Sequence, residues 1–457
     1  MRADLAVAGG IVVLPWGEAP ATVLIRDGRI AAIADLATSV AAAETIDARG
    51  RIVLPGLVDA HVHFNDPGRV DWEGVAAGSR AAAAGGVTTV VEMPLNAVPP
   101  TITADALSAK RTVFAGRCAV DYALWGGVVT DNTAELDALL DGGVVGLKAF
   151  MCDSGTEFAR ATDGVLLSGM RAAGRRGVPV AVHCESEELT AYLAAALRGA
   201  DRRDLAAYAA SRPPLAETEA VARALRLGDA AACTVYAVHL STPEAVDLVA
   251  GARRAGRPAY AETCPHYLAL DEDDLRLGPV AKCAPPLRPR ALVDALWSRL
   301  LRGEVDVIAS DHSPCPSAMK DVNDAWRAWG GITGVQTMLP VLIDEGVHRR
   351  GLSFGALAQL TAEAPARILG LAPHKGAITP GADADLVVVD PDREWTVTRE
   401  ALLSRHPHSP FLGRRLRGAV ERTIVRGVTV NLDGEPVGPE GWGSEVGSAT
   451  PPRNHSA

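Results

Sequence analysis

Residues 54–63 read Leu-Pro-Gly-Leu-Val-Asp-Ala-His-Val-His, an apolar run that ends in two histidines spaced two residues apart. In a β-strand, residues i and i+2 point to the same face, so His61 and His63 are expected to project side by side. Two imidazoles at a strand end can bind a divalent metal. An isolated His-x-His pair is more often one buried, hydrogen-bonded histidine and one surface histidine. The rest of the chain favours the metal site.

Composition limits the possible functions. The chain has 457 residues, 48% hydrophobic and 22% charged, which is enough for one large domain and a smaller one. Its net charge of −10 gives no sign of a nucleic-acid or membrane partner. We expect no signal peptide and no membrane span, because no run of about 18 apolar residues occurs. Seven scattered cysteines without a Cys-x-x-Cys pair are typical of reduced thiols in a cytoplasmic protein.

Apolar β-type runs alternate with alanine-rich helical stretches from residue 57 to about residue 370. The β-type runs are residues 57–63, 87–93, 121–127, 144–151, 179–184, 233–240, 258–264 and 305–311. The helical stretches include residues 72–84, 103–114, 133–140, 187–197, 217–226 and 243–255. This alternation predicts an α/β fold, a (β/α)8 TIM barrel over residues 56–374, with its active site at the C-terminal ends of the strands.

The sequences on either side of the predicted barrel have a different pattern. Residues 1–55 and 375–440 are rich in short β-type runs, and Asp27-Gly28 is a hairpin signal. We expect these flanks to pair into one small, discontinuous β-domain resembling a β-sandwich. Residues 441–457 are rich in glycine, serine, proline and charge, which predicts a disordered tail.

Polar side chains stand where the predicted barrel strands end. Each could by itself be a core group with satisfied hydrogen bonds, but their shared position in one predicted barrel favours a common site. Four histidines and an aspartate are more ligands than one zinc ion needs, so the pattern indicates two metals. The candidate ligands are His61, His63, Lys148, His183, His239 and Asp311.

Lys148 is unusual because it lies inside an apolar run, Val-Gly-Leu-Lys-Ala-Phe-Met at residues 145–151. Burial beside two cations would lower its pKa, and a neutral amine can take up CO2 to form an anionic carbamate. Such a carbamate offers two oxygens that could bridge both metals. The alternative is a lysine that extends to the barrel rim and pairs with Asp153.

Four motifs carry a resemblance to a known family. They are Gly-Leu-Val-Asp-Ala-His-Val-His at 56–63, Gly-Gly-Val-Thr-Thr-Val-Val-Glu-Met-Pro at 85–94, Glu-Thr-Cys-Pro-His-Tyr-Leu at 262–268 and Ala-Ser-Asp-His-Ser-Pro at 309–314. Over roughly residues 1–435 the chain resembles the cyclic amidohydrolases of the amidohydrolase superfamily, which include dihydroorotases, hydantoinases/dihydropyrimidinases and allantoinases. The resemblance implies two divalent metals, zinc or else manganese, cobalt or iron, and a homotetramer. It assigns His61, His63 and Asp311 to one metal, His183 and His239 to the other, and carboxylated Lys148 between them.

Departures from the family patterns narrow the substrate. Dihydroorotases usually have Leu-Arg-Glu-Pro-Gly where this chain has Phe-Asn-Asp-Pro-Gly at 64–68, so the cation for a substrate carboxylate is missing. Hydantoinases usually have a tyrosine that is absent from Phe-Met-Cys-Asp-Ser-Gly at 150–155. With Met-Pro-Leu-Asn at 93–96, Lys-Cys-Ala-Pro-Pro-Leu-Arg at 282–288 and Trp-Gly-Gly-Ile-Thr-Gly-Val-Gln at 329–336, the set is most similar to allantoinases. Glu92 departs from the aspartate that is commoner there.

The resemblance therefore implies hydrolysis of the cyclic amide bond of allantoin to allantoate, a step of purine and ureide catabolism. A hydroxide bridging the metals would attack the ring carbonyl, and Asp311 would pass a proton to the leaving nitrogen. His266 and His312 are expected at most to contact the metal ligands without binding a metal themselves. Candidate substrate contacts are Asn65, Asn96, Asp153, Ser154, and the backbone near Cys283 and Gly331, although loop capping is an equal alternative for Asn96 and Ser154. A hydantoinase/dihydropyrimidinase, or a non-catalytic assembly protein of this fold, stays open as an alternative.

Overall fold

A barrel of parallel strands forms the centre of the molecule in the computed structural model, which describes residues 2–38 and 41–447. Within these residues the barrel strands are β6 (Leu57–Val62), β7 (Val87–Glu92), β8 (Asp121–Leu124), β9 (Gly126–Gly127), β10 (Leu147–Phe150), β11 (Val180–His183), β12 (Val235–Ala237), β13 (Ala259–Thr263) and β14 (Val307–Ile308). Their pairing order is β6-β7-β8 and β9-β10-β11-β12-β13-β14. Only Trp125 separates β8 from β9, and a parallel bridge between Val62 and His312 closes the ring. The strands therefore lie where the sequence predicts them.

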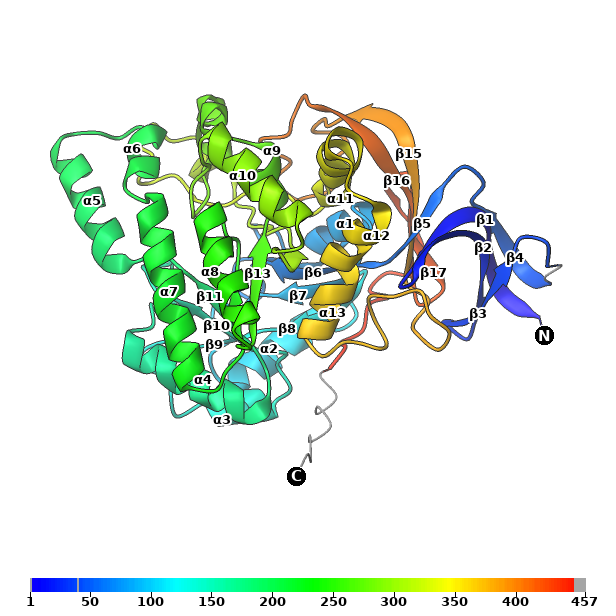
Figure 1. Ribbon diagram of the computed structural model, residues 1–457, viewed down its shortest axis with the longest axis horizontal. Helices are drawn as coiled ribbons and strands as arrows, with labels where there is room; N and C mark the ends of the chain where they lie inside the picture. The colour runs from blue at the N-terminus through cyan, green and yellow to red at the C-terminus, as the bar shows by residue number, and fades with distance from the viewer. Residues whose placement is uncertain (1, 39–40, 448–457) are drawn as a thin grey trace.

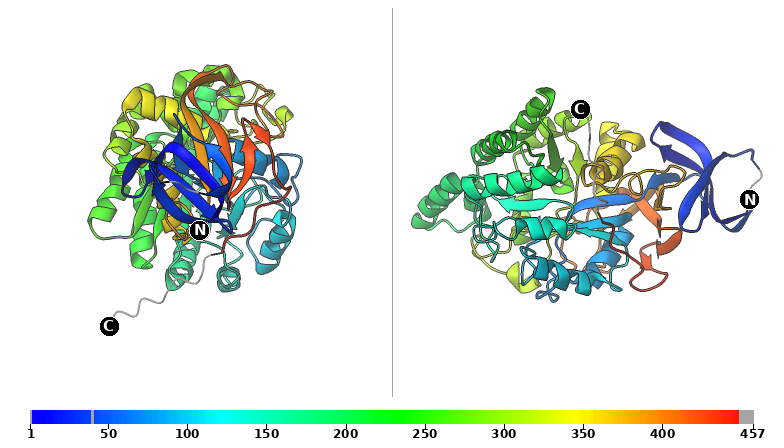
Figure 2. Two further views of the ribbon diagram at one scale, coloured as in Figure 1. Left: turned by 90° about the vertical axis from the view of Figure 1, so that its right-hand side faces the viewer. Right: turned by 90° about the horizontal axis from the view of Figure 1, so that it is seen from below.

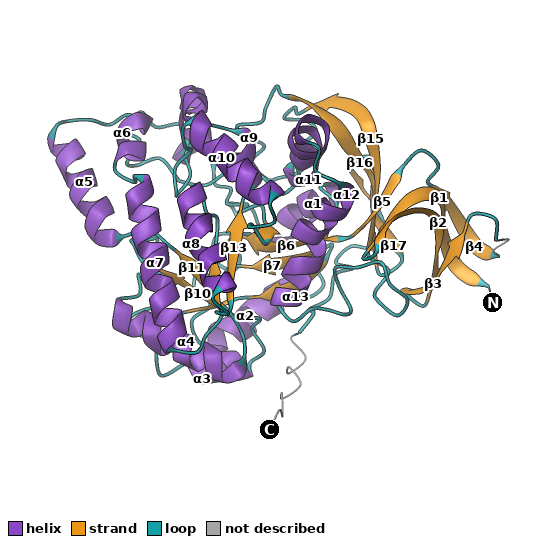
Figure 3. Cartoon of the chain, in the orientation of Figure 1, coloured by secondary structure: helices purple, strands orange, loops and turns teal. Residues whose placement is uncertain are grey.

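Helices surround the barrel (Figures 1 and 3). They are α1 (Val75–Ala84), α2 (Ala104–Phe114), α3 (Leu136–Asp141), α4 (Asp163–Arg176), α5 (Glu187–Gly199), α6 (Leu205–Ala210), α7 (Pro214–Ala230), α8 (Pro243–Arg254), α9 (Pro265–Ala269), α10 (Arg290–Leu301), α11 (Met338–Leu342), α12 (Phe354–Ala358) and α13 (Ala364–Ile368). The alanines of α1 at 81–84 are all buried, because small side chains let a helix pack closely on the strands. The helices α5 and α6 extend away from the barrel wall at the far left of Figure 1.

Strands from both flanks of the sequence form a second sheet, at the right of Figure 1 and facing the viewer on the left of Figure 2. They are β1 (Ala3–Leu14), β2 (Gly17–Arg26), β3 (Arg29–Asp35), β4 (Ala42–Asp47), β5 (Ile52–Pro55), β15 (Leu386–Thr396), β16 (Arg415–Val425), β17 (Val428–Leu432) and β18 (Glu435–Pro436). In the described residues these nine strands make one continuous sheet, joined where β15 pairs with β5. The expected β-structure built from both flanks is confirmed; its nine strands form one sheet in place of the sandwich-like arrangement, and this sheet packs an apolar cluster of its own.

The boundary between sheet and barrel lies at Gly56, between β5 and β6. We propose residues 1–55 with 375–440, and residues 56–374, as the two domains.

Residues 441–447 contradict the predicted disordered tail. The Val446 N–H donates to the Tyr122 carbonyl at 2.8 Å, and Arg111 pairs with Glu445 at 2.7 Å. Backbone pairing with the edge of β8 and this ion pair hold the segment against the barrel. The prediction is wrong for these residues, and the remainder of the predicted tail, 448–457, lies outside the described residues.

Two other expectations concern membranes and thiols. Within residues 2–38 and 41–447, no helix has both the length and the apolar character that a membrane crossing requires. All seven cysteines are buried and free, as the sequence predicts.

Candidate metal centre

The barrel strands bring the predicted ligands to one end of the barrel. His61 belongs to β6 and Lys148 to β10, while His183 ends β11. The Nε2 atoms of His61 and His63 lie 3.3 and 3.5 Å from the same oxygen of Asp311, Oδ1. The Nδ1 of His183 lies 3.0 Å from Nε2 of His239. The ring centroids of His61 and His239 are 5.4 Å apart, so the two groups adjoin.

Backbone conformation at this end of the barrel is unusual. His239 and Asp311 have φ values of 42° and 45°, a region that residues other than glycine rarely adopt. Asn65 and Asn96 also have positive φ, at 63° and 66°. Such conformations persist only where the surroundings impose them, and they cluster at functional sites. The geometry thus points to the same place as the ligand pattern.

A buried carboxylate orients His61. Glu262 Oε1 accepts hydrogen bonds from His61 Nδ1 at 2.9 Å and from the His239 backbone N–H at 3.1 Å. The hydroxyl of Tyr236 donates to the other oxygen of Glu262. With its proton on Nδ1, His61 presents the lone pair of Nε2 towards Asp311, which is the arrangement of a metal ligand with a carboxylate behind it.

The second histidine pair is oriented in a similar way. His183 Nε2 lies 2.8 Å from Glu185, whose carboxylate also pairs with Arg212. A proton on Nε2 leaves the lone pair on Nδ1, which faces His239. Phe150 stacks on the His183 ring at a centroid distance of 4.4 Å and limits its rotation.

Burial favours the uncharged forms of the histidines at this site and makes the neutral form of Lys148 more accessible. Desolvation lowers the pKa of His63 to about 4 and holds the pKa of His239 well below its usual value. It also lowers the pKa of Lys148 to about 8. Neutral imidazoles are the form that binds metals.

The donor set fits a metal ion. The ligand atoms of His61, His63 and Asp311 all lie within 4.8 Å of one another. Lys148 Nζ is buried and has no hydrogen-bond partner among the described residues, which is costly for an ammonium. Cys152 and Cys264 lie close to the site, but burial raises the pKa of Cys152 to about 12 and that of Cys264 well above its usual value. Their thiols therefore stay protonated and are poor ligands.

Two connected cavities open above the ligands. The inner cavity, about 60 Å³, is lined by His61, His63, Leu95, Asn96, Phe150, Ser154, His183, His239, Ala284, Asp311, Ser313, Trp329, Gly330 and Gly331. The outer cavity, about 520 Å³, includes Arg69, Asp153, Glu187, Tyr208, Arg212 and Lys282 in its lining. Phe150, Ser154, His183, Ala284, Trp329 and Gly330 line both. These shared residues form the passage between the ligands and the outer cavity.

The structure separates the predicted substrate contacts. Asn96, Ser154 and Gly331 line the inner cavity, and Asp153 lines the outer one. Asn65 lines neither cavity: it is fully buried and its amide donates to the Pro314 carbonyl at 3.3 Å.

Cys283 also lies behind the cavity walls, with its side chain buried. The prediction for this residue concerned its backbone, and its neighbours Lys282 and Ala284 do line cavities. The aromatic residues Phe150 and Trp329 line both cavities but were not predicted as contacts. Both residues belong to family-like sequence motifs, at 150–155 and 329–336, and this membership could have indicated that they line the site.

His266 and His312 lie behind the ligands. His266 belongs to a group with Cys264 and Asp311 whose ligand atoms are within 4.8 Å of one another. His312 accepts at Nδ1 from the backbone N–H of Gly334 at 3.2 Å, and its Nε2 lies 3.5 Å from Glu73. Its ring thus joins the end of β14 to the following loop.

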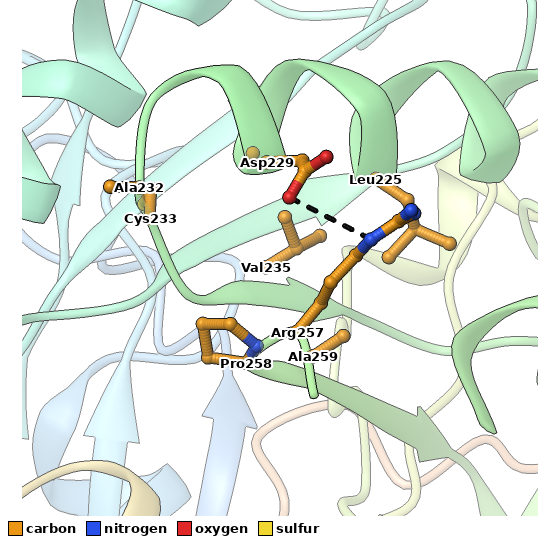
Figure 4. A pocket seen from close by; sticks show the side chains of 9 residues that line it. Leu225, Asp229, Ala232, Cys233, Val235, Arg257, Pro258 and Ala259 are labelled. Atoms are coloured by element: carbon orange, nitrogen blue, oxygen red, sulfur yellow. Dashed lines mark ion pairs between the residues drawn. The ribbon is translucent and has the colours of Figure 1, made fainter. Parts of the chain in front are cut away.

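A further small cavity, about 50 Å³, lies away from these ligands (Figure 4). Its lining includes Leu225, Val235 and Cys233, and it is crossed by an ion pair of 3.6 Å between Asp229 and Arg257. Because its charged groups already pair with each other, it offers no comparable chemistry.

Known proteins resemble this chain over almost its full length. The model of the amidohydrolase family matches residues 52–430. An allantoinase of Rubrobacter xylanophilus is 50% identical over 96% of this chain and 96% of its own length. An allantoinase of Solibacter usitatus is 48% identical over 93% of each chain. Among solved structures, the L-hydantoinase (dihydropyrimidinase) of Arthrobacter aurescens superposes with a TM-score of 0.95 at 37% identity, covering 97% of this chain and 100% of that one.

Proposed function

Since the chain belongs to the amidohydrolase family, we propose that it is an allantoinase, a hydrolase that opens the ring of allantoin and releases allantoate. One observation carries this proposal: relatives named allantoinase are 50% and 48% identical to it across at least 93% of both chains. The solved L-hydantoinase shares the fold at a lower identity of 37%. The chemistry of the site agrees with hydrolysis of a cyclic amide.

The ligand geometry supports a centre for two divalent metals. We place His61, His63 and Asp311 around one metal and His183 and His239 around the other, because the first three converge within 4.8 Å and the last two face each other at 3.0 Å. When bound, such ions supply an activated water and polarise the carbonyl that it attacks. Zinc suits the imidazole and carboxylate donors, as do manganese, cobalt and iron.

Lys148 is the group that could join the two sets of ligands. Its buried amine has no hydrogen-bond partner in the described part of the chain, and burial lowers its pKa to about 8, so the neutral form is accessible. The ammonium first loses one proton. The neutral nitrogen can then bond to the carbon of CO2 while one C=O electron pair moves onto oxygen and a second proton leaves the nitrogen, which gives an anion with two oxygens. That change would remove the cost of an unpaired ammonium beside the metals.

Asp311 has the position of a proton carrier. Its Oδ1 faces His61 and His63, while the residue contributes to the inner cavity where the scissile amide would lie. The carboxylate can take a proton from the attacking water and return it to the leaving ring nitrogen. This transfer lets the ring open without releasing an amide anion.

Polar groups of the inner cavity are the candidate substrate contacts. We assign Asn96, Ser154 and Gly331 to this role, with Asp153 in the outer cavity reaching only a substrate arm. The peptide groups of neighbouring Gly330 form no hydrogen bond within the described part of the chain. An uncharged substrate rich in urea groups can pair with such donors and acceptors.

Purified protein incubated with allantoin tests the function directly. We expect stoichiometric allantoate, in a reaction that stops on metal removal. A hydantoinase is the second candidate, favoured by the TM-score of 0.95 with the L-hydantoinase. Turnover of a 5-substituted hydantoin at least as fast as that of allantoin would establish that alternative.

The exposed surface of helix α5 is consistent with assembly into a homo-oligomer, and we propose a homotetramer. Only Thr190 is buried along Glu187–Gly199 in this chain, and Tyr192 leaves 73% of its surface exposed. An apolar helix surface of this kind commonly marks a protein interface. Sedimentation velocity at several concentrations measures the assembly.

A further inference from the structure

Lys320 is a buried lysine whose ammonium, among the described residues, forms hydrogen bonds to backbone carbonyls alone. It follows a short helical turn at Ser317–Met319, and 6% of its surface is exposed. The Nζ atom donates to the carbonyls of Gly331 at 2.7 Å, of Trp329 at 2.9 Å and of Pro279 at 2.9 Å. The carbonyl of Lys282 lies at 3.5 Å. An ammonium has three protons, so these three short hydrogen bonds use all of its donors.

These carbonyls belong to two segments that meet at the inner cavity. Residues 279–284 span the end of the 3-10 helix Glu272–Ala281 and the loop after it. Residues 329–331 belong to another loop, and the N–H of Gly331 donates to the Lys282 carbonyl at 2.9 Å. The lining residues Ala284, Trp329, Gly330 and Gly331, which we call the inner wall, are parts of these segments. Lys320 therefore ties together the two strips of backbone that form one side of the cavity.

Backbone carbonyls, and not an acidic side chain, stabilise the positive charge of Lys320. No carboxylate in the described residues forms an ion pair with it, and desolvation lowers its pKa to about 8. At neutral pH the cation is retained by carbonyl dipoles that converge on it. A charge-assisted hydrogen bond is stronger than a neutral one, so a single lysine can set the spacing of both segments.

We propose that Lys320 is a positioning residue for ring hydrolysis: it fixes the inner wall at the spacing that binds the substrate ring. The inference rests on the proposed function for the identity of the substrate. Its effect reaches substrate through the wall, because Lys320 itself lines neither cavity. Without it, three carbonyls lose a common donor and the wall can separate from the metal side of the cavity. The residue thus controls substrate affinity more than the chemical step.

The test replaces Lys320 by methionine, which keeps the length and removes the charge and the three donors. We expect KM for allantoin to rise at least about tenfold while kcat and metal content stay close to the parent values. The matched control is Lys110→Met. Lys110 is also buried, with its ammonium 2.8 Å from the Met93 carbonyl and 3.5 Å from the Glu92 carboxylate, so Lys110→Met removes an ion pair as well as a hydrogen bond. It lines neither cavity, so KM should not change in this variant even if the free energy of unfolding falls.

Hydrogen–deuterium exchange supplies a readout that does not need turnover. In Lys320→Met the amides of Gly331 and Trp329 should exchange faster than in the parent, and in Lys110→Met they should not. If Lys320→Met does not fold, Lys320→Gln, which keeps two donors without the charge, is measured in the same way.

The outcomes separate the two proposals. An unchanged KM, or unchanged exchange at Gly331, would overturn the positioning role and leave Lys320 as a contributor to stability only. If the parent protein does not hydrolyse allantoin at all, the proposed function fails, while exchange at Gly331 still shows whether Lys320 holds the wall.

Discussion

The carboxylate of Glu262 orients the imidazole of His61: Glu262 Oε1 lies 2.9 Å from His61 Nδ1. The two residues lie 201 positions apart in the chain and on different barrel strands, β13 and β6. The same carboxylate accepts from the backbone of His239 and from Tyr236. One buried acid therefore orients ligands of both proposed metals.

Replacing Glu262 by glutamine should weaken metal binding while keeping the shape of the site. The amide oxygen can still accept from His61, but it no longer makes the ring a stronger donor to the metal. Supporting residues of this kind typically contribute about 10–100-fold in metal affinity. Competition with a coloured chelator measures the change. Tyr236→Phe, which removes one hydrogen bond from Glu262 and leaves its charge, should have a smaller effect; unaltered affinity in Glu262→Gln would contradict the assignment.

Prolonged chelation should abolish activity, and zinc, manganese or cobalt should restore it. The reason is that His61, His63 and Asp311 supply ligands but no nucleophile of their own for a ring amide. Metal content is measured by mass spectrometry alongside the rate. Full turnover by protein freed of metal would rule out this mechanism.

The variant Lys148→Ala should lose at least one metal and nearly all activity, because the proposed carbamate would supply ligand oxygens to both metals. Short carboxylic acids should restore part of the rate by replacing the carbamate oxygens. Native mass spectrometry of the parent should show the added CO2. Unmodified Lys148 in active, metal-loaded protein would refute the carbamate, whereas Lys110→Met should keep both metals.

Substrates should rank with allantoin far ahead of hydantoin and dihydrouracil, and dihydroorotate should not react. No lysine or arginine occurs among the described residues that line the inner cavity, so a substrate carboxylate would be buried without a cation. Sites built on hydrogen bonds can discriminate against analogues that lack the matching group by factors on the order of 10⁴. Initial rates for the four compounds at equal concentration check the order. Comparable rates for allantoin and dihydrouracil would favour the hydantoinase alternative.

Stability should depend strongly on Lys375. This buried ammonium lies 2.5 Å from Asp121, 3.0 Å from Asp383 and 2.8 Å from Asp385, and so links the barrel to the sheet. Lys375→Met would remove the cation that pairs with the buried Asp385, while Asp121 and Asp383 would keep their pairs with Arg426 and Arg29. Leaving the Asp385 carboxylate without its cation should lower the free energy of unfolding by about 3–5 kcal/mol. Urea denaturation measures this loss. Arg175→Ala, which breaks an exposed pair with Asp137, is the control and should change it by less than about 1 kcal/mol.

Much of the fold could be predicted from local pattern. The runs that became β6, β7 and β11 are apolar and short, and the periodic helices α1, α2 and α8 follow strands directly. Such periodicity indicates which side of an element is buried, and it can be recognised from residues that are close together in the sequence. The single curled sheet and the packing of residues 441–447 depend on pairing between distant segments, which no local period encodes.

The sequence by itself determined the ligand types and their place at the strand ends, because strand direction and a two-residue period settle where His61 and His63 point. Only the tertiary structure decided which loop side chains face the cavities and which face away. Asn65 stands beside the ligands in sequence, yet its positive φ turns its amide towards Pro314 and away from both cavities. Lys320 belongs to no motif, yet its ammonium reaches Trp329 and Gly331. Loops have no repeating geometry, so the direction of their side chains follows from contacts that exist only after the chain has folded.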